Sequence, residues 1–80
     1  MQRIKVQFYA VFREQSGLSE DIVDTSALTA GDLYAELAYR HGFSLPPRLV
    51  RASINLQFKP LDAELHDGDT VVFIPPVAGG

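Results

Sequence analysis

The sequence predicts an α+β fold in which one sheet carries one main helix packed across a single face. Three segments support this prediction: "RIKVQFYAVF" (3–12) alternates apolar and polar residues like a strand, residues 29–42 have the period of a helix, and "TVVFI" (70–74) is a short apolar run. The predicted order is strand, strand, helix and then three strands, without an internal repeat or a linker. We therefore expect a single domain over residues 1–80, in which 75–80 form an extended tail.

The first strand should be buried on one side only, because its apolar residues recur at every second position. The "REQSG" segment then interrupts the pattern, with Ser16-Gly17 as a turn signal. A shorter, charged strand is predicted at 20–23, as is typical of a sheet edge. The positions predicted to face the core are Ile4, Val6 and Phe8, and those predicted to face the other way are Lys5, Gln7 and Tyr9.

The helix predicted at 29–42 has recognisable ends. Thr29 is a suitable N-cap, and Asp32 stands three residues later, where a capping box has Glu. Leu33 and Leu37 repeat at helical spacing, and Gly42 suits the left-handed position after the last turn. The apolar stripe predicts that this helix packs against the sheet.

The last third of the chain predicts strands at 52–58 and 70–74, separated by a tight turn at Asp67-Gly68. The final strand is apolar on both faces, so one face cannot pack against the helix. Tyr9, Phe58 and Ile74 are assigned to that second face. The residue pattern alone leaves three explanations open: a loop covers this face, its apolar residues are ordinary scattered surface residues, or it docks a protein partner.

Composition excludes several classes of function. The 80 residues include no cysteine, so a disulfide or a thiolate site is impossible, and we expect a cytoplasmic protein. The net charge of −3 argues against a nucleic-acid partner, and no apolar run is long enough to span a membrane. No signal peptide is expected, since the chain begins with a strand pattern.

The segment "FIPPVAGG" predicts a projecting tail. Pro75 and Pro76 favour an extended backbone, while Gly79 and Gly80 have no Cβ and so allow a partner to enclose the chain closely. The chemically useful group at its tip is the α-carboxylate of Gly80, which adenylation can activate for attack by sulfide or an amine.

Three blocks, "IKVQFYAVFRE", "ASIN" and "HDGDTVVFIPPVAGG", resemble the small sulfur-carrier subunits of molybdopterin synthase, the MoaD type of the ubiquitin-like ThiS/MoaD family. The resemblance covers the whole chain and implies a ubiquitin-like β-grasp fold with a mixed sheet. It implies that a ubiquitin-activating-like adenylyltransferase uses ATP to adenylate Gly80, which a sulfur donor then converts to a thiocarboxylate.

The resemblance further implies that the tail (Pro75, Pro76, Val77, Ala78 and Gly79) inserts into a large synthase subunit and delivers sulfur to a cyclic pyranopterin for the molybdenum cofactor. The expected assembly is a heterotetramer of two small and two large subunits. Tyr9, Phe58 and Ile74 match the family's partner-docking positions. The chain itself is expected to bind no cofactor and to act as a carrier, with the catalytic side chains on the large subunit.

Other functions are compatible with the same residues. A carrier for thiamin thiazole, cysteine or tungsten-cofactor synthesis would share the fold and the terminal glycines, although Pro75-Pro76 favours the pterin pathway. A ubiquitin-like protein modifier would use the same adenylation, and a passive interaction module would not use its tail.

The remaining polar residues predict structural roles. His41 should favour the helix dipole and His66 should lie in a solvated turn, so no metal site is predicted. Asp67 and Asp69 are expected to bond backbone N–H groups in a turn, and the Asn55 side chain to bond the backbone in a turn or at a strand end. Arg13 and Glu14 could form a surface ion pair or contact the activating enzyme, and the sequence does not decide between these roles.

Overall fold

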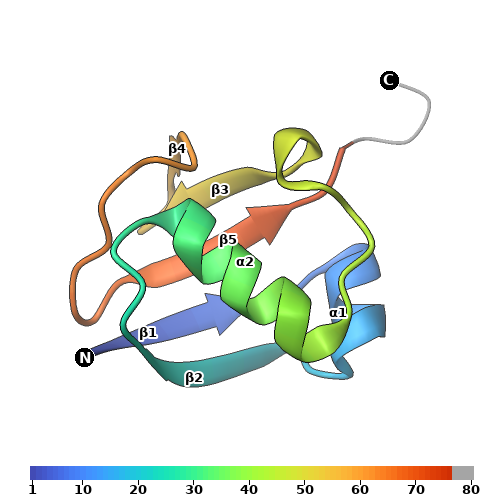
Figure 1. Ribbon diagram of the computed structural model, residues 1–80, viewed down its shortest axis with the longest axis horizontal. Helices are drawn as coiled ribbons and strands as arrows, with labels where there is room; N and C mark the ends of the chain where they lie inside the picture. The colour runs from blue at the N-terminus through green and yellow to red at the C-terminus, as the bar shows by residue number, and fades with distance from the viewer. Residues whose placement is uncertain (77–80) are drawn as a thin grey trace.

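The computed structural model describes residues 1–76, in which a sheet of five strands carries a long helix across one face (Figure 1). The strand order is β2-β1-β5-β3-β4, so the last strand in the sequence lies in the middle of the sheet. The elements are β1 (Gln2–Gln7), α1 (Ala10–Ser16), β2 (Glu20–Thr25), α2 (Ala30–His41), η1 (Pro47–Leu49), β3 (Arg51–Ile54), β4 (Gln57–Lys59) and β5 (Thr70–Ile74).

The sheet is mixed, as predicted. β1 and β5 run parallel, with Val6 opposite Val71, whereas the β1–β2, β3–β5 and β3–β4 pairs are antiparallel. Strands β1, β5 and β3 therefore all lie between hydrogen-bonded neighbours, and the central strand β5 is the most apolar of the five. The charged strands β2 and β4 form the two edges, where acidic and basic side chains oppose pairing with another chain.

Helix α2 follows the sequence prediction closely. The side chain of Thr29 accepts a hydrogen bond from the Asp32 N–H at 3.1 Å, and Gly42 ends the helix with a φ of 72°. Leu33 and Leu37 are fully buried against the sheet. Along β5, Val71 and Phe73 face this core while Val72 and Ile74 are half-buried on the other side, which confirms the predicted alternation.

The prediction of a strand through residue 12 was wrong, because β1 ends at Gln7 and helix α1 begins at Ala10. Phe8 and Phe12 are both buried, a spacing of four that satisfies strand alternation and a helical turn equally well. The structure adopts the helix because its first turn brings Phe12 onto Tyr34 and Phe43, at ring-centroid distances of 5.8 and 4.9 Å. The predicted turn at Gly17 is correct, since Gly17 ends α1 with a φ of 77°.

The single strand predicted at 52–58 is a hairpin. β3 and β4 are joined at Asn55 and Leu56, whose φ values of 53° and 71° reverse the chain within two residues. The turn predicted at Asp67-Gly68 is present, with Gly68 at a φ of 89°. No helix within residues 1–76 has both the length and the apolarity needed to cross a membrane.

Candidate docking face and tail exit

The sheet has an open face, defined as the side opposite α2. Because Ile4, Val6, Val71 and Phe73 point into the core, their neighbours along each strand point outward. The open face therefore consists of Arg3, Lys5 and Gln7 on β1, Glu20, Ile22 and Asp24 on β2, Thr70, Val72 and Ile74 on β5, Arg51 and Ser53 on β3, and Phe58 on β4.

The β1–β2 half of the open face is mainly charged. Arg3 Nε donates to Asp24 Oδ1 at 3.0 Å, and this hydrogen bond raises the pKa of the Arg3 guanidinium. Lys5 Nζ lies 3.5 Å from Glu20 Oε2, and Ile22 lies between the two acidic residues. Such solvent-exposed pairs contribute only about 0–1 kcal/mol each to stability. Because its side chains are mainly charged, this half of the face can remain in contact with water without a partner.

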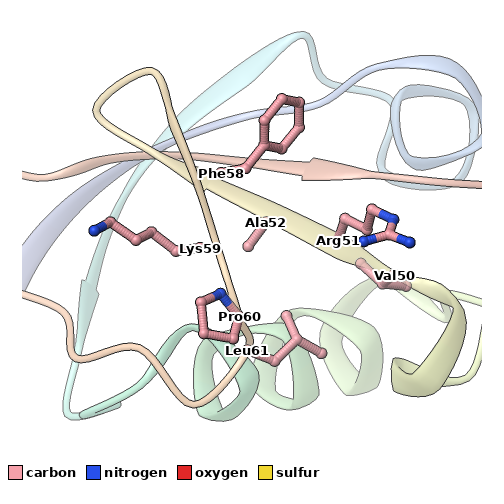
Figure 2. A pocket seen from close by; sticks show the side chains of 7 residues that line it. All are labelled: Val50, Arg51, Ala52, Phe58, Lys59, Pro60 and Leu61. Carbon is pink, nitrogen blue, oxygen red and sulfur yellow. The ribbon is translucent and has the colours of Figure 1, made fainter.

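The other half, over β5, β3 and β4, is more apolar. Phe58 lies opposite Ser53, which in turn lies opposite Val72, so these three side chains form one row across the face. Figure 2 shows the Phe58 ring pointing away from α2, on the opposite side from Pro60 and Leu61. The Phe58 side chain is 77% exposed, which is unusual for a large aromatic residue with nothing to cover it.

The three predicted docking residues are not in one contact cluster. Ile74 lies two residues beyond Val72 on the same face, and strand β3 separates it from Phe58. Tyr9 is 48% exposed and lies just beyond β1, where it precedes the first turn of α1. The structure thus leaves all three side chains accessible at least in part, and their role in docking remains a prediction.

The tail exit, defined as Ile74–Pro76, lies at the end of the central strand. Ile74 is opposite Arg51 of β3, Pro75 is half-buried and Pro76 is exposed. Pro75 has no N–H and cannot continue the ladder, so the sheet ends here. The predicted tail residues Val77, Ala78, Gly79 and Gly80 lie outside the described residues.

The polar residues of the 66–69 turn have structural partners. Asp67 Oδ1 accepts the Arg3 N–H at 2.6 Å, and Asp69 Oδ2 accepts the His66 N–H at 2.8 Å. Asn55 Oδ1 accepts the Thr70 N–H at 2.9 Å. These contacts confirm the predicted turn roles of Asp67, Asp69 and Asn55. Among residues 1–76, no three His, Cys, Asp or Glu side chains lie together in a way that could hold a metal.

The remaining predictions concern His41 and the Arg13-Glu14 pair, and the structure shows the surroundings of each. The His41 ring packs edge-on against Phe8 at 5.8 Å and lies 5.6 Å from Phe43, and within residues 1–76 its buried Nε2 has no hydrogen-bond partner. Arg13 and Glu14 are both exposed, and no ion pair joins them in the part of the chain that the structure describes.

Sequence reasoning missed one feature, a groove of about 400 Å³ on the open face between the β3–β4 turn and strands β1 and β5. Leu56, which is 94% exposed, forms one wall of this groove. The available signal was the hairpin spacing itself: Asn55 stands between two alternating runs, but it is followed by Leu rather than the usual Gly.

The chain is similar to known proteins over nearly its whole length. Residues 6–80 match the model of the ThiS family. The molybdopterin synthase sulfur carrier subunit of Escherichia coli strain K12 is 35% identical over 80 residues, which cover 96% of this chain and 99% of that protein.

Solved structures agree with the fold. A putative molybdopterin converting factor, subunit 1, from Pyrococcus furiosus superposes with a TM-score of 0.77 at 28% identity, covering 96% of this chain and all of that one. The small archaeal modifier protein 1 from Methanosarcina acetivorans has a TM-score of 0.78 at 23% identity, covering 100% and 98% of the two chains, which indicates a shared fold alone. With its ubiquitin-like β-grasp fold and a match over nearly its whole length, the chain belongs to the ThiS family.

Proposed function

We propose that the chain is the sulfur-carrier subunit of a molybdopterin synthase and that Gly80 carries the sulfur. The observation that carries this proposal is the 35% identity, over 96% of the chain, to a protein with that role in its name. The geometry supports it, because the central strand β5 leads directly into Pro75 and Pro76. Ile74, the last residue of β5, is still paired with Arg51 of β3, so a tail that follows it starts from a fixed point on the sheet.

The proposed chemistry needs only a terminal carboxylate from this chain. Attack of the Gly80 carboxylate on the α-phosphorus of ATP releases pyrophosphate and forms an acyl-adenylate. Sulfide sulfur then attacks the acyl carbon and displaces AMP, which leaves a thiocarboxylate. ATP and the sulfur donor are used by a ubiquitin-activating-like adenylyltransferase, so this chain acts as a carrier and co-substrate.

Sulfur transfer occurs on the large synthase subunit in this proposal. The tail, Pro75–Gly79, enters the active site of that subunit, which supplies the acid–base groups, and the thiocarboxylate donates sulfur to a cyclic pyranopterin. Two such donations produce the dithiolene of the molybdenum cofactor. Tyr9, Phe58 and Ile74 dock the large subunit in a heterotetramer of two small and two large subunits, and the complex is cytoplasmic.

Two alternatives share the activation step and differ in the acceptor. A carrier for another pathway would pass its sulfur to a thiazole, cysteine or tungsten-cofactor precursor. A protein modifier would instead join Gly80 to lysines, and the fold shared with the archaeal modifier protein is compatible with that role. The acceptor therefore has to be identified by experiment.

The test is the intact mass of the purified chain after incubation with the adenylating enzyme of its own host, ATP and sulfide. We expect a mass increase equal to the replacement of one oxygen by sulfur, and its loss when Gly80 is deleted. The charged chain should then convert cyclic pyranopterin when the large subunit is added. Charging followed by conjugation to protein lysines, without pterin conversion, would favour the modifier. No charging by a demonstrably active enzyme would contradict both roles.

A further inference from the structure

The two-residue turn between β3 and β4 has an uncommon composition for its backbone. Asn55 and Leu56 both have positive φ values, 53° and 71°. A hairpin turn of this kind fits the right-handed twist of the strands, and Asn-Gly is the favoured pair because both positions are left-handed. Asn tolerates this region, whereas a bulky residue such as Leu loses roughly 1–2 kcal/mol there.

Asn55 alone is sufficient to hold the turn. Its backbone N–H donates to the Thr70 carbonyl at 2.8 Å, and its side-chain amide donates to Asp69 at 2.9 Å and accepts from the Thr70 N–H at 2.9 Å. These three bonds fasten the turn to the start of the central strand β5. Leu56 contributes none of them, so glycine at this position would form the same turn with less strain.

The Leu56 side chain also gains nothing from burial within the chain, since it is 94% exposed. The backbone strain at Leu56 is therefore a cost that burial of its side chain does not offset. Backbone strain of this kind is commonly found at residues that bind a ligand or a partner. What Leu56 does provide is one wall of the groove, whose other lining residues are Lys5, Gln7, Asn55, Thr70 and Val72.

The groove is continuous with the proposed docking face. Val72 lines the groove and also belongs to the row that ends at Phe58, and Ile74 lies two residues further along β5. The distance along β5 from Thr70 to Ile74 is roughly 13 Å, at about 3.3 Å per residue. A specific interface covers about 800 Å² on each partner, a patch roughly 28 Å across, which is wider than this distance. A partner that binds both Phe58 and the tail exit therefore reaches the groove.

We propose that Leu56 is a binding anchor for the large synthase subunit, which seats an apolar side chain in the groove between Leu56 and strands β1 and β5. This inference rests on the proposed function, because it adds a contact to the same complex. It explains why leucine occupies a position where glycine would give the more stable turn.

The test compares Leu56→Gly with wild type in two assays: urea unfolding, and calorimetric binding to the recombinant large subunit from the same host. We expect Leu56→Gly to be at least as stable as wild type, because it removes the strain, and yet to bind about tenfold or more weakly. Leu56→Asn, which also tolerates the left-handed region, should behave in the same way. The matched control is Tyr39→Ala, which truncates an equally exposed side chain on α2 and should leave binding unchanged.

Each other outcome overturns the inference in a distinguishable way. Equal binding by Leu56→Gly and wild type would show that Leu56 is outside the interface. A loss of stability that accounts for all the loss of binding would assign Leu56 to the fold. Failure of the wild-type chain to bind the large subunit would contradict the proposed function itself. Sedimentation of the free chain as a dimer that Leu56→Gly dissociates would assign the groove to a second copy.

Discussion

Truncation of Phe58 should separate partner binding from folding. The Phe58 side chain is 77% exposed on the open face, so the fold loses little when it is removed. Full burial of such a side chain is worth about 1.5–3 kcal/mol, and about three quarters of that remains to be gained when a partner covers it. We therefore expect Phe58→Ala to weaken large-subunit binding by about 1–2 kcal/mol, or roughly 5- to 30-fold in Kd, with less than about 0.5 kcal/mol lost in unfolding.

Two positions on β5 provide the matched comparison. Ile74 is half-buried on the open face and should resemble Phe58, whereas Phe73 beside it is fully buried in the core. Phe73→Ala should cost about 3–5 kcal/mol of unfolding free energy. Binding is measured by calorimetry on the folded fraction, and stability by urea unfolding. If Phe58→Ala and Ile74→Ala lowered stability without changing the binding of folded molecules, both residues would belong to the core and the docking assignment would be refuted.

Three further predictions follow from individual contacts. Adding one residue after Gly80 should abolish sulfur transfer in the pterin assay while the urea midpoint stays unchanged, because the reactive carboxylate would be displaced; undiminished transfer would contradict the role of Gly80. Gly31→Ala should destabilise the fold by roughly 1–2 kcal/mol in thermal unfolding, since the added Cβ would lie 3.1 Å from the Leu61 carbonyl oxygen. An unchanged Tm would mean that the segment around Leu61 moves away without a free-energy cost. Burial raises the pKa of Tyr34 above its ordinary 10.0, so the stability gained from the neutral phenol is present below pH 10 and is lost as pH rises through the folded pKa. Tyr34→Phe should flatten that alkaline loss, and an unaltered pH profile would contradict this explanation.

The sequence was sufficient for elements whose signals are local. Helix α2 was predicted with its caps because Thr29 and Gly42 act within one turn of the helix ends. The inward and outward sides of β1 and β5 followed from the strand period. The family was recognisable from the segment after "DGD", and the comparisons confirm it.

Where two local patterns coincide, the sequence could not choose between them. Phe8 and Phe12 fit both a strand and a helix, and the helix formed because the ring of Phe12 packs on Tyr34 and Phe43, which come from distant parts of the chain. The hairpin at Asn55-Leu56 was missed for a similar reason. Its turn is held by bonds to Asp69 and Thr70, and Leu at the second position gave no local turn signal.

The sequence by itself determined the α+β class, the principal helix, the alternation of the central strands and the family, because short-range periods, caps and a terminal motif specify them. The tertiary structure decided the strand order, the helix α1 and the exposure of Phe58 and Leu56 on one face. These features depend on which strands pair and which side chains meet across the sheet, and such contacts join residues that are far apart in the chain.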